Sequence, residues 1–177
     1  SKYLFPSFQT IAGSGKNGAI VHYRARKNNT KLLKKNEIFL CDSGGQYKFG
    51  TTDVTRTICF KNQNKEIKDI FTNVLKGHIA VVQTDLNKKK TGKLIDIEAR
   101  RFLKKNGLDY EHGTGHGVGF FSNVHEGPQA ISKKNSVKIQ NGMVLSNEPG
   151  YYKKGKFGIR IENLIYANKV GNKLIFK

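Results

Sequence analysis

The spacing of apolar residues changes along the chain, and it predicts strands first, then two helices, then strands again. In the first 60 residues, apolar side chains form short runs or alternate with polar ones, as is typical of β-strands. Gly44, Gly45 and Gly50 predict a hairpin within this part. The predicted strands cover residues 8–12, 19–23, 37–42 and 53–60, and a turn is predicted at residues 27–29.

The middle of the chain has a helical period instead. Apolar residues recur three or four positions apart from Ile67 to Ile79, which predicts an amphipathic helix over residues 63–86. The same spacing predicts a second helix over residues 94–106, with Gly107 as its C-cap. Further strands are predicted at residues 143–148, 158–166 and 174–176. This order favours an α+β fold with antiparallel sheet, in which two related halves face each other.

Composition limits the partners of the chain. The net charge is +19, from 32 Lys and Arg against 13 Asp and Glu, which would suit a nucleic acid or an anionic membrane. The lysines are scattered, however. They are not accompanied by the bidentate arginines and stacking aromatic side chains that are typical of nucleic-acid-binding proteins. No apolar stretch is long enough to span a bilayer. We therefore expect neither a nucleic acid nor a membrane as partner.

The two cysteines, Cys41 and Cys59, are too few for a disulfide framework. Each lies in an apolar run, so we expect both to be reduced residues of the core. A reducing compartment is the default for such a chain, which favours the cytoplasm.

Five side chains of metal-binding type stand out against this basic background. They are Asp42, Asp53, His116, Glu148 and Glu162, each in a glycine-rich or strand-like setting. Carboxylates repel one another at close range unless a cation or a shared proton holds them. If all five converge, they could hold two hard divalent ions. Taken alone, Asp42 and Asp53 are more simply interpreted as turn acids that face water.

Three histidines lie in a stretch that is otherwise rich in glycine. Glycines alternate with other residues from Gly113 to Gly119, which lets backbone and substrate approach closely and argues against a helix. We therefore do not expect His112 and His116 on one metal ion, although a spacing of four would allow it on a helix. A single histidine is often a hydrogen-bonded core residue, but His112, His116 and His125 together indicate a site.

The two glutamates are predicted to lie in strands with apolar neighbours. A glutamate among Ile and Leu is rare unless it is paired or binds metal. An ion pair between Glu162 and Arg160 is the alternative. Because residues i and i+2 of a strand share a face, we expect Arg160 to support the same site instead.

Read together, several segments resemble the pita-bread metallopeptidase family, which includes aminopeptidase P, prolidase, methionine aminopeptidase and creatinase. The resemblance runs in order through almost the whole chain, and it is closest to the large cytosolic type of aminopeptidase P. Creatinase lacks this ligand set, so the five intact ligands argue against it. The similar segments are residues 20–23, 40–47, 50–57, 112–119, 123–128, 147–152 and 158–163.

The resemblance implies a fold of two pseudo-symmetric halves with a curved antiparallel sheet and outer helices. It also implies that Asp42 binds one metal through both oxygens, that Asp53 and Glu162 bridge two ions, and that His116 and Glu148 complete the second. Manganese is the usual metal of this branch and suits an oxygen-rich site with one imidazole. Affinity order alone would favour zinc or cobalt.

The resemblance assigns further roles around the ligands. Glu148 would shuttle a proton, His125 and His112 would stabilise the oxyanion or hold the peptide, and His22 would line the pocket on the proline side. Arg160 and Thr55 would support the ligands from behind.

The implied activity is hydrolysis of an N-terminal Xaa–Pro bond in a peptide with proline at its second position. A prolidase that takes dipeptides only, and a non-catalytic module that binds through its basic surface, are the alternatives. The family's catalytic domain is usually longer, so we expect residues 1–177 to form most of one such domain, truncated at the N-terminus. This fragment itself could be inactive, and homodimers of the longer protein are left open.

Overall fold

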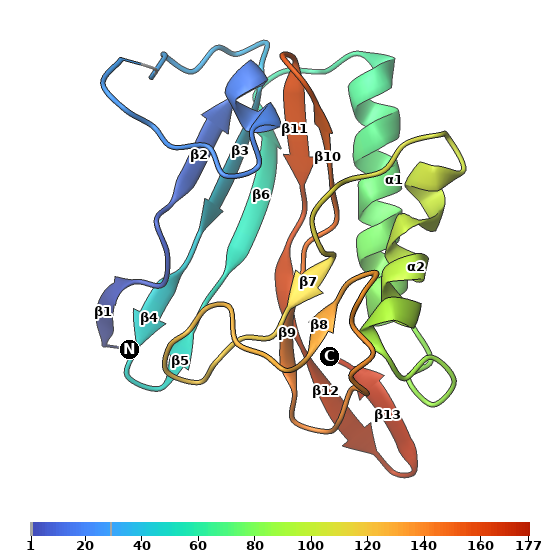
Figure 1. The fold of residues 1–177 in the computed structure, drawn as a ribbon. Coiled ribbons are helices and arrows are strands. Elements are labelled where there is room, and N and C mark those ends of the chain that lie inside the picture. Colours follow the sequence, from blue (N-terminus) through green and yellow to red (C-terminus); the bar gives the residue numbers. More distant parts are fainter. Residues whose placement is uncertain (1, 29) are drawn as a thin grey trace.

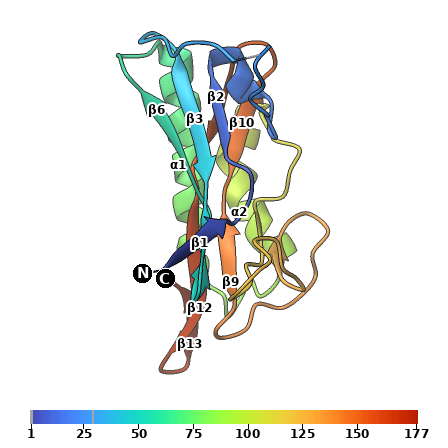
Figure 2. The same cartoon turned by 90° about the vertical axis from the view of Figure 1, so that its left-hand side faces the viewer.

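Two groups of antiparallel strands face each other, and both helices lie on the outer side of the second group (Figure 1). This computed structural model describes residues 2–28 and 30–177, so Asn29, part of the turn predicted at residues 27–29, lies outside the described residues. Seen from the side of the first group, its strands overlie the helices (Figure 2). The expected α+β class with outer helices is confirmed.

The first strand group contains a three-stranded sheet in the order β2-β3-β6 and a smaller sheet in the order β1-β4-β5. The hairpin predicted around Gly44, Gly45 and Gly50 is present as β4 and β5. The bounds are β1 (Tyr3–Pro6), β2 (Ile11–Ser14), β3 (Ile38–Ser43), β4 (Gly45–Tyr47), β5 (Gly50–Thr51) and β6 (Val54–Cys59).

The second strand group contains the sheet β13-β12-β9 and two antiparallel pairs, β10 with β11 and β7 with β8. Its strands belong to the last third of the chain, apart from β7, which carries the glycine-rich stretch. The bounds are β7 (Gly115–His116), β8 (Ala130–Ile131), β9 (Val144–Asn147), β10 (Gly150–Lys153), β11 (Phe157–Arg160), β12 (Asn163–Val170) and β13 (Lys173–Phe176).

Helices α1 (Lys65–Val82) and α2 (Gly92–Lys104) pack against each other and against the second strand group. The Asn64 side chain caps α1 by accepting a hydrogen bond from the backbone N–H of Ile67 at 3.0 Å. Both predicted helices exist, each displaced by a few residues at one or both ends. Among the described residues, no helix is both long enough and apolar enough to cross a membrane.

The strand predicted at residues 19–23 is wrong. A 3₁₀ helix, Gly15–Ala19, is followed by a turn in this region. The backbone N–H of Ile20 donates to Asn17 and that of Tyr23 donates to Ile20, so these groups bond locally instead of to a neighbouring strand. Gly15 has a φ of +52°, which an alternating apolar pattern does not reveal.

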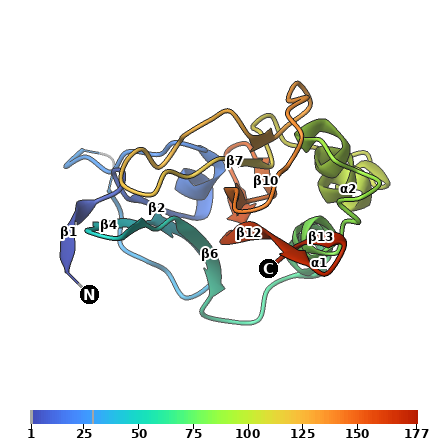
Figure 3. The ribbon, with the colours of Figure 1, turned by 90° about the horizontal axis from the view of Figure 1, so that it is seen from below.

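The long strand predicted at residues 158–166 is interrupted after Arg160. The interruption lies where the chain meets β6 of the first group (Figure 3). There the Thr57 hydroxyl donates to the carbonyl of Arg160 at 2.9 Å and accepts from its N–H at 3.1 Å. The N–H of Glu162 donates to the carbonyl of Thr55. Contact with another strand group therefore divides β11 from β12, and the local sequence does not show it.

Three further expectations need correction. The strand predicted at residues 8–12 begins only at Ile11 and continues to Ser14. The tyrosine-containing strand β10 has no predicted counterpart. Cys41 and Cys59 are both free thiols, but Cys59 is exposed and so is not a core residue.

Candidate metal centre

A cavity of about 290 Å³ lies between the two strand groups. Its lining includes every sequence-predicted site residue except Thr55, together with apolar side chains such as Phe8, Ile11 and Val21. The predicted residues on its wall are Asp42, Asp53, His116, Glu148, Glu162, His22, His112, His125 and Arg160.

Both strand groups contribute the five candidate ligands. Asp42 lies near the end of β3, and Asp53 directly precedes β6 in the first group. In the second group, His116 lies in β7, Glu148 follows β9, and Glu162 lies in the interruption between β11 and β12.

Three of the five candidate ligands offer atoms within reach of one ion, and Glu148 contacts one of these three. The Nε2 atom of His116 is 3.3 Å from Oδ2 of Asp53 and 3.3 Å from Oε1 of Glu148. Asp53, His116 and Glu162 each offer a ligand atom, and these atoms lie within 4.8 Å of one another. The Nδ1 of His116 is 3.0 Å from the Gly117 carbonyl oxygen. In the neutral ring, Nδ1 donates its hydrogen to this oxygen, so the lone pair of Nε2 faces the carboxylates.

Two buried carboxylate oxygens show that this site fits a cation. Oδ1 of Asp42 and Oε1 of Glu162 are buried and have no hydrogen-bond partner among the described residues. Such a group is costly to bury unless something compensates it. A divalent ion between the carboxylates would give both oxygens a partner. Carboxylate oxygens are the hard ligands that Mn²⁺ and similar ions prefer.

The pKa values of the carboxyl groups also indicate that the site favours a bound positive charge. Burial raises the pKa of Asp42 to about 6, although Arg160 opposes the shift. Burial, together with the charges of Glu148 and Asp53, raises the pKa of Glu162 to about 9. Protons thus take the place of a cation when none is bound, and an ion would be expected to displace them.

His116 and Glu148 shift in opposite directions. Burial opposes a charged His116, but the contacts with Asp53 and Glu148 outweigh it and raise its pKa to about 10. Burial favours a neutral Glu148, but the contact with His116 outweighs it and lowers the pKa. The Ser146 hydroxyl holds both residues, since it donates to Oε1 of Glu148 and accepts from the N–H of His116.

Arg160 and Thr55 lie behind the carboxylates. Buried Arg160 donates from one terminal nitrogen to Oδ2 of Asp42 at 2.6 Å and from Nε to the Thr55 hydroxyl at 3.1 Å. Thr55 in turn donates to Oε2 of Glu162 at 2.6 Å. Arg160 therefore supports Asp42 directly and Glu162 through Thr55. The alternative ion pair between Arg160 and Glu162 does not form among the described contacts.

The accessory histidines occupy different positions on the cavity wall. His112 donates from Nδ1 to the Gly113 carbonyl at 2.7 Å, and its Nε2 lies 2.9 Å from the hydroxyl of Tyr152. The ring of His125 lies edge-on to that of His116, with centroids 4.0 Å apart. His125 and His22 are both exposed, and His22 comes from the turn that replaces the predicted strand.

Sequence reasoning missed three polar residues that hold this site. Tyr152 joins His112 to Arg160, whose terminal nitrogen donates to its hydroxyl at 2.7 Å. Ser146 precedes Glu148 by two positions, a spacing on one face of a strand that could have indicated it. On α1, the Nδ1 of His78 lies 3.1 Å from the carbonyl of Asn147, which directly precedes Glu148.

Comparison with known proteins identifies the relatives of this chain. The model of metallopeptidase family M24 matches residues 1–169. A probable Xaa-Pro aminopeptidase P from Laccaria bicolor is 53% identical over 93% of this chain and 26% of its own length. Aminopeptidase P2 from Arabidopsis thaliana is 51% identical over 93% of this chain and 24% of its own length.

Solved structures give the same grouping. An X-prolyl aminopeptidase from Caenorhabditis elegans, described as a cytosolic enzyme with a di-nuclear active site, has a TM-score of 0.92 and 42% identity over the whole of this chain and 30% of its own. A prolidase from Pyrococcus furiosus has a TM-score of 0.84 and 30% identity over 97% of this chain and 48% of its own. The chain thus spans about a quarter of the length of the curated relatives above. Its fold is the pita-bread fold, and the chain belongs to metallopeptidase family M24.

Proposed function

We propose that the protein is a metal-dependent aminopeptidase that hydrolyses the bond between the first residue of a peptide and a following proline. One observation carries the proposal: carboxylates from both strand groups meet in one cavity, and two of their buried oxygens have no partner among the described residues. A structural role alone would not require so many acids together in a chain with 13 Asp and Glu.

The donor set supports two divalent ions. We assign Asp42 to one ion, Asp53 and Glu162 to bridging positions, and His116 and Glu148 to the second ion. When bound, the ions would supply an acidified water as nucleophile near neutral pH and positive charge for the peptide carbonyl. The described di-nuclear site of the Caenorhabditis elegans relative supports this number. We propose manganese as the ion, with zinc and cobalt as the outcomes that metal analysis would separate from it.

The residues of the chain itself would orient the substrate and move the proton. Glu148 has an ionised carboxylate held by Ser146, so it can accept a proton and deliver it to the leaving proline nitrogen. Exposed His125 beside His116 can donate to the developing oxyanion. His112, held by Tyr152, and His22, which also lines the cavity, would position the peptide.

The relatives support the substrate class and the compartment. Several relatives at about 50% identity are named Xaa-Pro aminopeptidases, and the Caenorhabditis elegans enzyme is described as cytosolic. We accordingly propose a peptide with proline at its second position as substrate and the cytoplasm as location. The likeness to a prolidase keeps a dipeptide-specific enzyme as the second candidate.

Peptide cleavage tests the proposal. The purified full-length protein, loaded with manganese, is incubated with an Xaa-Pro-Xaa tripeptide, the matching Xaa-Pro dipeptide and a tripeptide that has alanine in place of proline. Release of the first residue from the proline tripeptide, lost on chelation, is the expected result. Cleavage of the dipeptide alone would indicate a prolidase. No metal-dependent release from any proline peptide would contradict the proposal.

A further inference from the structure

A second charged cluster lies outside the cavity, on helix α2. Asp96 and Arg100 are one helical turn apart and face inward, with side chains only 1% and 2% exposed. The Nε of Arg100 donates to Oδ2 of Asp96 at 2.7 Å. Taking two charges out of water is costly, so a buried ion pair is weak evidence of a stabilising role. The other contacts of the pair are therefore informative.

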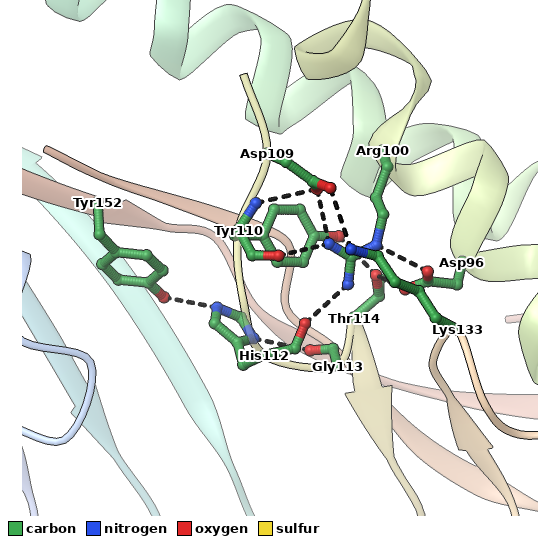
Figure 4. A network of polar contacts seen from close by, with 9 residues as sticks. All are labelled: Asp96, Arg100, Asp109, Tyr110, His112, Gly113, Thr114, Lys133 and Tyr152. Atoms are coloured by element: carbon green, nitrogen blue, oxygen red, sulfur yellow. Dashed lines mark hydrogen bonds and ion pairs between the residues drawn. The ribbon is translucent and has the colours of Figure 1, made fainter. Parts of the chain in front are cut away.

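All other hydrogen bonds of Arg100 go to the segment that leads into the glycine-rich stretch (Figure 4). One terminal nitrogen donates to Oδ1 of Asp109 at 2.7 Å and to the carbonyl of Tyr110 at 2.6 Å. The other terminal nitrogen donates to the carbonyl of His112 at 2.7 Å. The guanidinium also lies 3.9 Å from the centre of the Tyr110 ring. The planar guanidinium thus holds this segment at three residues, Asp109, Tyr110 and His112.

Asp96 holds the next part of the same segment. The Thr114 hydroxyl donates to Oδ1 of Asp96 at 2.6 Å and also contacts the Tyr110 hydroxyl. The carbonyl of Thr114 accepts the backbone N–H of Glu148 at 2.8 Å. Asp96 is therefore two hydrogen bonds away from the backbone of a candidate ligand.

His112 is fixed at both its backbone and its ring. Arg100 binds its carbonyl, while the Gly113 carbonyl and the Tyr152 hydroxyl contact its two ring nitrogens (Figure 4). Tyr152 is itself held by Arg160, which binds Asp42. The contacts reach continuously from a buried pair on the outer helix to the carboxylates of the cavity.

We propose that the Asp96–Arg100 pair is a positioning device, in which Arg100 sets the orientation of His112 and Asp96 sets the backbone of Glu148 through Thr114. The part that His112 plays in the reaction rests on the proposed function, whereas the geometry does not. Lysine at position 100 could keep the charge and the pair with Asp96. Its N–H groups all lie on one nitrogen, however, so it could not reach the four acceptors that the guanidinium nitrogens contact.

The test compares Arg100→Lys with Arg101→Lys in the purified protein. Arg101 is the neighbouring residue, is 56% exposed and pairs only with Glu98 among the described ion pairs. For Arg100→Lys we expect shifted imidazole signals of His112 by nuclear magnetic resonance, two bound metal ions as before, and a kcat reduced by about 10- to 100-fold. Arg101→Lys should change none of these.

A double-mutant cycle separates positioning from general loss of structure. If Arg100 acts through His112, then adding Arg100→Lys to His112→Ala should change kcat by no more than about twofold. The proposal would be overturned if the kcat losses of the two single variants multiplied in the double variant. It would also be overturned if the His112 signals were unchanged in Arg100→Lys. If Arg100→Lys does not fold, Asp109→Ala removes one partner of the guanidinium at an exposed position and should still shift the His112 signals. If the parent protein cleaves no peptide, the proposed function fails, and the resonance of His112 alone decides the positioning role.

Discussion

At the scale of single residues, Asp53 comes from the first strand group and lies close to candidate ligands of the second. It is buried, its Oδ2 contacts His116, and it lies within ligand distance of Glu162. A bridging carboxylate serves both ions, so its loss should affect both.

We therefore expect Asp53→Asn, which keeps the size of the side chain, to reduce the metal content from two ions to none or nearly none. Elemental analysis after dialysis against manganese measures it. Asp69→Asn, at an exposed acid of α1, is the matched control and should leave the content unchanged. A variant at Asp53 that retains two ions would refute the bridging role.

The raised pKa values predict how pH affects the metal-free protein. Asp42 and Glu162 titrate at about 6 and about 9 when folded, against about 4 for carboxylates in an unfolded chain. The folded state thus binds more protons across this window, and the free energy of unfolding falls as pH rises through it. His116, with a pKa of about 10, acts in the same direction, because its folded-state charge is lost only above that pH.

The expected result is a Tm of the chelated protein that decreases between about pH 5 and pH 9, while added manganese raises Tm more at high pH than at low pH. Thermal unfolding followed by circular dichroism, with and without metal, measures it. A Tm of the chelated protein that rises over this window would contradict the assigned shifts.

The sequence indicated the residues of the cavity better than their partners. Glutamates with apolar neighbours in the sequence are rare enough to identify Glu148 and Glu162 as candidates. The partners of Arg160 lie instead in β3 and β6, more than 100 positions earlier in the chain, and no local pattern shows such a pairing.

At the scale of elements, the contact between the two helices depends on Gly77. A Cβ at this position would lie 2.2 Å from the backbone carbonyl oxygen of Ala99 in α2. Backbone cannot yield as a flexible side chain can, so the helices would have to separate.

Alanine is favoured over glycine in a helix by about 1 kcal/mol, yet we expect Gly77→Ala to lower the free energy of unfolding by about 1–3 kcal/mol through overpacking. Urea denaturation measures it. Lys76→Ala, at the exposed neighbouring position, should stay within about 0.5 kcal/mol of the parent. A stabilised Gly77→Ala variant would show that the helices are not in close contact there.

The two helices could be predicted because their periods are long and regular, while the short strands could not be predicted reliably. Residues 19–23 alternate as a strand does, but only Tyr23 is buried and local turn hydrogen bonds prevail. The interruption after Arg160 has an apolar sequence on both sides, so its cause lies in tertiary contact.

At the scale of the whole molecule, the two strand groups meet along β6. Thr57 makes two hydrogen bonds to the backbone of Arg160 there, and Thr55 contacts Glu162 through its side chain and its carbonyl. We expect Thr57→Val to cost about 1–3 kcal/mol in the free energy of unfolding, because buried backbone groups lose their partner.

The same variant should also bind manganese more weakly, because Arg160 and Glu162 shift together. Isothermal titration calorimetry measures the affinity, and Thr72→Val on the exposed face of α1 is the control. Unchanged manganese affinity in Thr57→Val would mean that the contact between β6 and the segment from Arg160 to Glu162 does not set the ligand geometry.

The division of the ligands between the two strand groups has a mechanical consequence. An ion held by Asp53 from one side and by His116 or Glu162 from the other would act as a cross-link between segments more than 60 positions apart in the sequence. Its release should then loosen the junction of β6 and β12 while leaving the helix-packed core in place. Amide hydrogen exchange at that junction would report metal occupancy in a protein that is otherwise still folded.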